Sequence, residues 1–271
     1  MQVISSKDNE VIKNVKKLKE KKYRDLSNSY IIEGIKLVKE AIAEKAKIKQ
    51  IIMCEDYTDN VELDKDTLYD IAKYNVVYVT RNIINLITDV KTPQGIIAVV
   101  EKKESNTFSD SKEVVDYSQD IIIALDDIQD PGNLGTILRT VDSANLKQII
   151  LSKNCADSYS PKVVRSTMGG IFRINIIEVE DLKQELLKAQ KHGFKVMVTS
   201  LDTENSVYDV EYNKKVIVIG NEANGVSEEI QNIANEKVKI PMLGKTESLN
   251  ASVAAGIMIY EYVRRKIKRL H

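Results

Sequence analysis

The feature that most constrains the fold of this chain is a series of short, continuously apolar segments in its C-terminal half, with helical patterns between most of them. We expect five strands there, at residues 121–125, 148–151, 196–199, 216–220 and 238–241. A last helix is expected from near Leu249 towards Lys268. Continuous apolar runs indicate strands buried on both faces, and therefore an α/β fold with a parallel sheet between helices. Ligands of such sheets bind at the carboxyl ends of the strands.

The first hundred residues predict a second, smaller αβ unit. An amphipathic helix is expected over residues 8–22, and a strand at 30–34 leads into a helix at 34–45. Further strands are expected at residues 51–53, 76–79 and 96–100. The polar stretch 101–120 is the best linker candidate.

A length of 271 residues suits two domains. We expect an N-terminal domain at residues 1–104, a linker at 105–118 and a C-terminal domain at 119–271.

The supply of cysteine and histidine limits the chemistry. Cys54 and Cys155 lie far apart in the sequence, and His192 and His271 are the only histidines. A zinc site or a Ser/His/Asp triad is therefore poorly supplied, and no metal is expected. We find no secretory signal and no apolar run long enough for a bilayer, so the expected setting is reduced and cytoplasmic.

The net charge of the chain is zero, but the charge is unevenly distributed. Residues 1–24 hold eight Lys or Arg and only three Asp or Glu. Basic residues also gather near the C-terminus, at Arg264, Arg265, Lys266, Lys268 and Arg269. Local basic patches form an electrostatic footprint for phosphate, although solvated helix faces explain the same pattern equally well.

Polar residues follow the predicted strands in three segments. In the first, Gly132 and Gly135 follow a strand and open a helix, where backbone amides bind anions. This segment lacks the G-x-G-x-x-G pattern, which makes a dinucleotide site a weak interpretation. The plain structural interpretation is that Gly132 forms a turn, Asn133 caps the helix and Arg139 is a solvated residue.

The other two segments also have plain interpretations. Gly220 ends a buried strand and Glu222 follows it, as an acid near a helix N-terminus would. Ser248 or Asn250 serves as an N-cap in the third segment, and Leu249 as a core residue.

Taken together, the segments 125–140, 218–226 and 238–254 resemble the three motifs of the SpoU (TrmH-type) family of ribose 2′-O-methyltransferases. The order and the spacing match, and the resemblance covers residues 121–265. It implies the α/β-knotted methyltransferase fold, with a deep trefoil knot near the C-terminus. Residues 1–100 resemble more loosely a small substrate-binding domain related to ribosomal protein L30e, most typically at residues 30–38.

The resemblance implies roles for individual residues. Arg139 is expected to orient a phosphate and stabilise the developing alkoxide as a cation, and Glu222 to hold Arg139 or Asn133 in place. The implied catalytic residues are Arg139, Asn133, Glu222, Ser248 and Asn250. The implied S-adenosylmethionine-binding positions are Thr199, Ser200, Leu201, Gly220, Ile240, Met242 and Leu249. Lys162 and Arg165 are implied RNA contacts, with solvated helix charges as the alternative.

The resemblance also implies a homodimer built on the last helix and the knot. The apolar stripe of Val253, Ile257 and Tyr260 suits such an interface, and equally an intrachain core. The leading hypothesis is methylation of large-subunit ribosomal RNA. A tRNA ribose methyltransferase, a thiopeptide-resistance rRNA methyltransferase and a non-catalytic RNA-binding assembly factor remain as alternatives, and a flavodoxin-like nucleotide binder is disfavoured by the missing phosphate loop.

Overall fold

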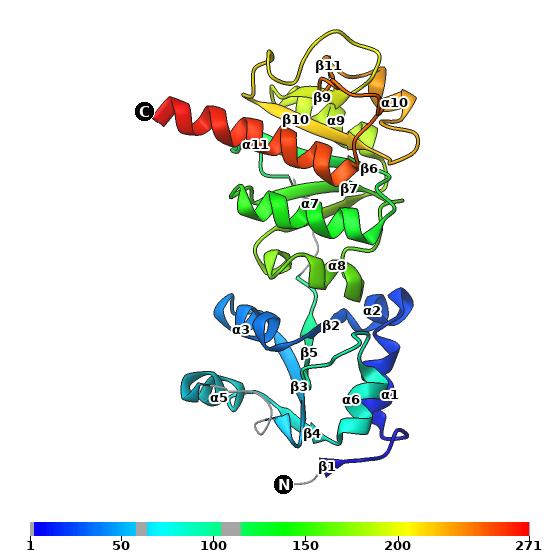
Figure 1. The fold of residues 1–271 in the computed structure, drawn as a ribbon, viewed down its shortest axis with the longest axis vertical. Helices are drawn as coiled ribbons and strands as arrows, with labels where there is room; N and C mark the ends of the chain where they lie inside the picture. Colours follow the sequence, from blue (N-terminus) through cyan, green and yellow to red (C-terminus); the bar gives the residue numbers. More distant parts are fainter. Residues whose placement is uncertain (1–2, 58–63, 104–114, 271) are drawn as a thin grey trace. The chain divides into compact units, whose positions relative to one another are not determined.

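The computed structural model describes residues 3–57, 64–103 and 115–270 (Figure 1). The chain divides into two compact units. The first comprises Met1–Lys103 and Tyr159–Phe172, and the second Glu104–Ser158 and Arg173–His271. No helix in the described part of the chain has the length and apolar composition needed to cross a membrane.

The first unit contains a five-stranded mixed sheet in the order β1-β4-β3-β5-β2. Its strands are β1 (Val3–Ile4), β2 (Ser29–Glu33), β3 (Ile48–Cys54), β4 (Val76–Val79) and β5 (Ile96–Glu101). Strand β5 runs antiparallel to β2 and β3, whereas β3, β4 and β1 are parallel. The described helices of this unit are α1 (Glu10–Lys17), α2 (Lys21–Ser27), α3 (Ile35–Ala43), α5 (Lys65–Ile71), α6 (Arg81–Ile87), α8 (Pro161–Ser166) and the short 3-10 helix η1 (Gly170–Phe172).

The prediction of a single helix over residues 8–22 is wrong. Helix α1 ends before residue 22, and a second helix, α2, begins at Lys21. Helix α1 ends at Lys17 with Leu18 as its C-cap, and the Arg24 guanidinium donates to the carbonyl oxygens of Leu18 and Lys19 at 2.8 and 2.7 Å. Carbonyls at a helix C-terminus lack intrahelical partners, so a buried guanidinium stabilises the break. Arg24 is only 3% exposed and therefore does not belong to the basic surface expected over residues 1–24.

The segment Tyr159–Phe172 packs with the first unit although it lies far along the chain. The ring of Tyr159 lies 4.8 Å from that of Tyr30, and the Lys102 ammonium lies 5.1 Å from the Tyr159 ring. Burial raises the pKa of the Tyr30 hydroxyl well above its ordinary range. An aromatic pair with a cation over one face holds this segment in place.

The second unit contains a six-stranded sheet in the order β11-β9-β10-β6-β7-β8. Every pair of neighbouring strands is parallel, which confirms the predicted parallel sheet. The strands are β6 (Ile121–Asp126), β7 (Gln148–Ser152), β8 (Asn175–Val179), β9 (Lys195–Thr199), β10 (Lys215–Gly220) and β11 (Glu236–Val238). The described helices are α7 (Pro131–Ser143), α9 (Leu182–Lys191), α10 (Glu228–Gln231) and α11 (Ala251–Leu270).

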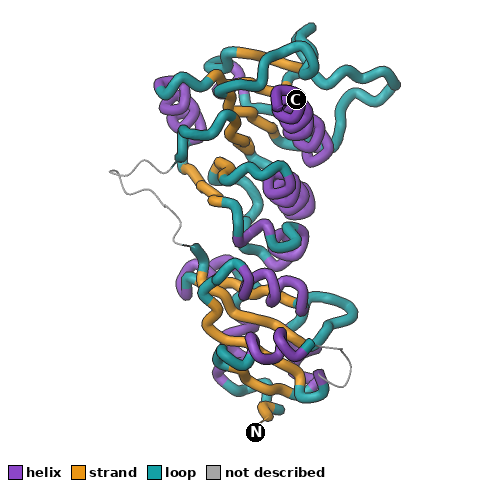
Figure 2. The backbone as a smooth tube through the Cα atoms, turned by 90° about the vertical axis from the view of Figure 1, so that its left-hand side faces the viewer, coloured by secondary structure: helices purple, strands orange, loops and turns teal. Residues whose placement is uncertain are grey.

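Helices cover both faces of this sheet (Figures 1 and 2). Leu182, Leu186 and Ala189 of α9 pack into one core cluster with side chains from the inner strands, such as Val196 and Val218. Helices α7 and α11 lie side by side and contact β7 and β10, respectively. The alternation of side chains along each buried strand supplies an apolar surface to both layers.

Two details of this sheet differ from the sequence prediction. Strand β8 was not predicted, because it is an edge strand and its sequence Asn-Ile-Ile-Glu-Val mixes polar and apolar residues. Strand β11 covers residues 236–238 rather than 238–241, since beyond it the Lys239 amide donates to the Asn205 carbonyl. Most of the predicted linker 105–118 lies outside the described residues. At its end, Val115 is 4% exposed and belongs to the core of the second unit.

Candidate active site at the carboxyl end of the parallel sheet

The predicted catalytic and cofactor residues lie at the ends of four neighbouring strands or in the segments that follow them. Strands β11, β9, β10 and β6 are adjacent and parallel, and in their register Val238 pairs with Thr199 and Gly220 with Asp126. These residues end their strands, so the loops that follow leave from the same edge of the sheet. The topology therefore brings together segments that are far apart in the sequence.

Asp130, and not Asn133, caps the N-terminus of helix α7. The N-cap is Asp130, whose carboxylate accepts from the Asn133 backbone amide at 2.8 Å, and Pro131 is the first helical residue. Both residue types are preferred at these positions. The interpretation of Asn133 as the helix cap is therefore wrong, and its side chain is directed to other partners.

The Asn133 side chain lies between two other predicted catalytic residues. Its Nδ2 donates to Glu222 Oε1 at 2.9 Å, and its Oδ1 accepts from Asn250 Nδ2 at 2.9 Å. Glu222 Oε1 also lies 3.4 Å from the backbone amide of Asp130. The first, second and third motif segments thus meet through one amide group.

Asn250 has two roles at once. Its Oδ1 accepts from the backbone amides of Ser252 and Val253 at 3.0 and 3.3 Å, and from Ser252 Oγ at 2.6 Å. Asn250 therefore caps α11, as its plain structural interpretation holds, while its Nδ2 binds Asn133. Of the two cap candidates, Ser248 makes no hydrogen bond with a described residue.

The protonation of Glu222 depends on these contacts. Partial burial raises the pKa of this carboxyl, but the hydrogen bond from Asn133 and backbone hydrogen bonds at Glu222, Asp130 and Gln129 outweigh it. The net effect is a pKa below the ordinary value for glutamate. Glu222 is therefore an ionised acceptor at neutral pH.

Arg139 is exposed on α7, six residues beyond Asn133. This separation corresponds to about 9 Å along the helix axis and about 120° around it, so the two side chains leave different faces. Arg139 forms no hydrogen bond or ion pair with the described residues. Of the two partners predicted for Glu222, the structure gives it Asn133 and not Arg139.

The predicted cofactor positions surround the same edge of the sheet. Thr199 and Gly220 end β9 and β10, and Ser200 donates its backbone amide to Val238 at 2.9 Å. Ile240, Met242 and Leu249 are half-buried, whereas Leu201 is 70% exposed. The backbone amides of Ile240, Met242 and Leu249 donate to no described residue. Apolar side chains beside unpaired backbone donors fit a ligand that combines an aromatic base with polar groups.

Gly220 stands where the backbone doubles back on itself. A Cβ atom there would lie 2.1 Å from the Gly225 carbonyl carbon and 2.1 Å from the Val226 nitrogen. Only glycine fits this close approach. Asn221 and Gly225 then exchange two backbone hydrogen bonds of 2.9 Å, which close the turn that carries Glu222.

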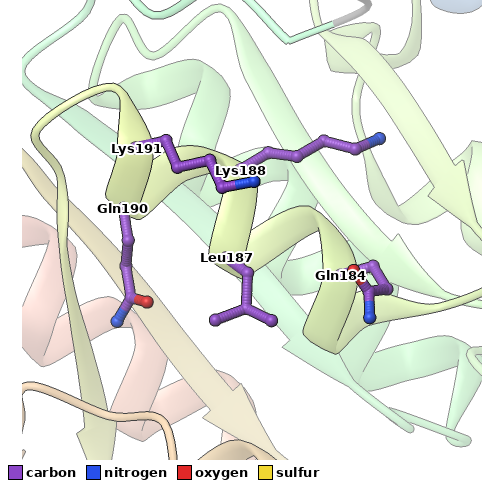
Figure 3. Close-up of a pocket in the computed structure, with 5 residues that line it drawn as sticks. All are labelled: Gln184, Leu187, Lys188, Gln190 and Lys191. Atoms are coloured by element: carbon purple, nitrogen blue, oxygen red, sulfur yellow. The ribbon is translucent and has the colours of Figure 1, made fainter.

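The two predicted RNA contacts do not belong to this cluster. Lys162 is exposed and Arg165 half-buried on α8, in the segment that packs with the first unit. A surface concavity lies elsewhere, along α9, and shares no residue with the predicted site (Figure 3). It is lined by Gln184, Leu187, Lys188, Gln190 and Lys191. Among the described residues, no group of three or more His, Cys, Asp or Glu side chains is arranged to hold a metal ion.

Three polar residues beside the site were not predicted from the sequence. The buried Asp126 carboxylate accepts from the Ser227 backbone amide at 2.7 Å, and Asn221 Nδ2 donates to the Asp127 carbonyl at 2.8 Å. All three residues stand at or directly after the end of an apolar strand. That position was the available signal for Asp126, Asp127 and Asn221.

Comparison with known families places the chain among RNA-modifying enzymes. The SpoU rRNA Methylase family matches residues 120–260, and an MRM3-like substrate binding domain matches residues 9–98. The 23S rRNA (guanosine(2553)-2′-O)-methyltransferase RlmP of Bacillus subtilis (strain 168) is 30% identical over 261 residues. That alignment covers 96% of this chain and 98% of the relative.

Solved structures agree with these matches. An rRNA methyltransferase from Sinorhizobium meliloti has a TM-score of 0.82 and 30% sequence identity, with coverage of 97% of this chain and 98% of that chain. The AdoMet-bound structure of an rRNA methyltransferase from the same organism gives the same TM-score and coverage at 29% identity. The similarity therefore extends over both units.

The depressed pKa of Glu222 predicts a pH-dependent contribution to stability. A carboxyl group whose pKa is lower in the folded state stabilises the fold above its unfolded pKa and loses this effect as pH falls through the folded pKa. We expect Glu222→Gln to lower the melting temperature at neutral pH. The difference from the wild type should shrink below about pH 4.5, near the ordinary pKa of glutamate.

Melting curves followed by circular dichroism between pH 3 and pH 8 provide the measurement. Glu229→Gln, which removes one exposed acid from α10, controls for the loss of a charge. A Glu222→Gln difference that stays constant down to pH 3 contradicts the prediction.

Proposed function

We propose that this chain, which belongs to the SpoU rRNA Methylase family, methylates a ribose 2′-hydroxyl of 23S ribosomal RNA. It is an S-adenosylmethionine-dependent RNA 2′-O-methyltransferase with the α/β-knotted, trefoil fold of the SpoU and TrmH enzymes. The B. subtilis relative, whose name specifies 23S rRNA, supports the choice of substrate. The observation that carries the catalytic assignment is the Asn133 side chain held between Glu222 and Asn250.

In the reaction a weakly acidic hydroxyl oxygen forms a bond to the methyl carbon as the carbon–sulfur bond of the donor breaks, and the hydroxyl proton is released to water. S-adenosylmethionine, when bound, supplies a methyl group on a positively charged sulfur. A guanidinium keeps its proton at neutral pH, so we assign Arg139 to charge stabilisation rather than to proton removal. Its five donors suit a phosphate and a developing alkoxide.

Three of the other predicted catalytic residues hold one another in position. Glu222 fixes the Asn133 amide, and Asn133 in turn fixes Asn250 at the start of α11. Ser248 is exposed two residues before Asn250, which leaves its hydroxyl available to substrate or donor. We assign donor binding to the loops after β9, β10 and β11. The residues are Thr199, Ser200, Leu201, Gly220, Ile240, Met242 and Leu249.

We assign substrate binding to a domain of residues 1–104 and catalysis to a domain of residues 119–271, with 105–118 as the linker. The segment Tyr159–Phe172 belongs to the second domain in sequence but packs with the first unit. The match to a substrate binding domain over residues 9–98 supports this division. Helices α1 and α2 expose Lys16, Lys17, Lys21 and Lys22, and two of these ammonium groups lie 5.8 and 6.0 Å from the Tyr23 ring. Cations beside an aromatic ring suit RNA. Lys162 and Arg165 on α8 are further candidates for phosphate contacts.

We propose a homodimer formed through α11. The stripe of Val253, Ile257 and Tyr260 is not the intrachain core, because Val253 and Tyr260 are 50% and 49% exposed. The buried apolar residues among the described side chains of the helix are instead Ala251, Ala255, Met258, Ile259 and Tyr262. An exposed apolar stripe on a helix supports a protein interface. Tyr260 also donates to Ser143 Oγ on α7 at 3.1 Å, so the stripe adjoins the helix that carries Arg139.

The basic C-terminus supports RNA binding less than its sequence indicates. Arg264 and Arg265 pair with the buried carboxylate of Glu261 at 2.6 Å, whereas Lys266 and Lys268 are exposed and the Arg269 side chain lies outside the described part. Because the proposed substrate is ribosomal, we place the protein in the cytoplasm.

Substitution of Arg139 tests the catalytic assignment. We expect Arg139→Ala to lower kcat by about 100- to 1000-fold, the loss that follows removal of a donor aimed at developing negative charge. Arg139→Lys should lose most of the activity as well, since lysine keeps the charge but not the planar donor pair. Methyl transfer from labelled donor to RNA provides the measurement.

Lys147→Ala, which removes an exposed cation just beyond α7, is the control. Near-full activity of Arg139→Lys would count against a bidentate role. Calorimetric titration of the wild type with S-adenosylmethionine separates an enzyme from a non-catalytic RNA-binding protein, because the latter would give no binding.

Mapping of ribose methylation identifies the substrate. We expect deletion of the gene to remove one 2′-O-methyl group from 23S rRNA and to leave tRNA unchanged, as read by mass spectrometry of total RNA. Loss of a tRNA methyl group instead would select the tRNA alternative. A thiopeptide-resistance enzyme would show loss of resistance with the same rRNA change.

Substitution in the α11 stripe tests the dimer. A glutamate buried in an apolar interface has no partner, so Val253→Glu should weaken dimerisation about tenfold or more. Sedimentation velocity at several protein concentrations provides the measurement. Leu26→Glu, at another exposed apolar position, should leave the sedimentation unchanged. A wild-type protein that sediments as a monomer refutes the dimer.

A further inference from the structure

Asp127 has a backbone conformation that is unusual for its residue type. It directly follows β6 and has a φ of +57°, in the left-handed region that favours glycine. Aspartate and asparagine enter this region more readily than other non-glycine residues because their short polar side chains bond locally. Strained backbone of this kind persists where the surroundings hold it.

Two side chains, one from the last residue of β7 and one from the loop after it, hold Asp127 in place. Ser152 Oγ accepts from the Asp127 backbone amide at 2.9 Å and donates to Asp127 Oδ1 at 2.5 Å. Asn154 Nδ2 donates to Asp127 Oδ2 at 3.0 Å. Both carboxylate oxygens and the backbone amide are thus engaged, and the direction of the Asp127 carbonyl is fixed.

That carbonyl points at the loop that carries Glu222. It accepts from Asn221 Nδ2 at 2.8 Å. Asn221 Oδ1 accepts in turn from the backbone amides of Ala223 and Asn224, at 2.9 and 3.2 Å. The Asn221 amide therefore joins the loop after β6 to the turn after β10, with its donor on one side and its acceptor on the other.

The same turn is tied at its far end. The Ser227 backbone amide donates to Asp126 Oδ2 at 2.7 Å, and Asp126 is 6% exposed. Asp126 and Asp127 thus hold the turn of residues 221–227 at both ends. Glu222 lies inside this span and reaches Asn133. We call the hydrogen bond from Asn221 Nδ2 to the Asp127 carbonyl the clasp. The position of the Glu222 carboxylate depends on it.

We propose that Asn221 is a positioning residue for methyl transfer, which acts by fixing the Glu222 turn against the left-handed Asp127. This inference rests on the proposed function of the Glu222–Asn133–Asn250 cluster. Asn221 touches neither donor nor RNA in this role. A displacement of about 1 Å at a catalytic cluster lowers rates by up to about a hundredfold. Loss of the clasp should therefore lower kcat and leave the affinity for RNA unchanged.

Asn221→Asp removes the clasp with the smallest change in shape. The introduced carboxylate keeps the acceptor for the amides of Ala223 and Asn224, but it loses the donor and faces the Asp127 carbonyl. We expect kcat to fall about tenfold to a hundredfold, while KM for RNA stays within about twofold. Asn224→Asp makes the same charge change three residues later, where the side chain bonds no described residue, and should keep kcat within about twofold of the wild type.

Variants of Asp127 provide the second, independent arm. Asp127→Asn keeps the tolerance for positive φ and an acceptor for Ser152, so it should retain nearly full kcat. Asp127→Ala loses the side-chain contacts and disfavours the left-handed conformation, so its kcat should fall as in Asn221→Asp. If Asn221→Asp does not fold, the kcat values of Asp127→Asn and Asp127→Ala test the positioning role of Asn221 on their own.

All rates are measured on full-length protein below its melting temperature, per site that binds S-adenosylmethionine. Wild-type kcat in Asn221→Asp, or equal losses in Asn221→Asp and Asn224→Asp, would overturn the positioning role. A lower melting temperature with unchanged kcat per binding site would also overturn it, because the role would then be structural. An inactive wild type would instead refute the proposed function itself.

Discussion

The organisation of the site depends on the direction of one chain of hydrogen bonds. An ionised carboxylate only accepts, so Glu222 requires the Asn133 amide to present its nitrogen. The Asn133 oxygen is then left to accept from Asn250, whose own oxygen receives the first amides of α11. One negative charge thus orders two amide groups and ends at the positive end of a helix. Residues separated by 89 and 117 positions in the sequence are joined in this way.

Periodicity located most of the second unit because its strands are buried on both faces. Five of its strands were expected, with β8 missed and β11 misplaced by its short, partly polar sequence. The carboxyl ends of the strands also predicted where the functional loops meet. Which side chains meet there did not follow from local patterns. The sequence pattern indicated Asn133 as the helix cap, whereas in the structure Asp130 is the cap.

Long-range contacts account for the remaining differences. Arg24 belonged to a basic run in the sequence, yet it is buried against the end of α1. The strand order β11-β9-β10-β6 and the return of α11 to α7 are likewise properties of the whole chain. Knots are nearly absent from proteins, so local physics argues against the trefoil topology that the family has. The motif resemblance was therefore necessary to predict it.

The composition of the first unit has a consequence for how the chain is made. This unit includes Tyr159–Phe172, and the ring of Tyr30 packs against that of Tyr159. During synthesis, more than a hundred further residues leave the ribosome after Tyr30 before Tyr159 is available to pack against it. The N-terminal part therefore emerges first but is completed only after β6, α7 and β7 of the second unit have also been translated. The first unit therefore cannot finish folding before part of the second unit has been synthesised.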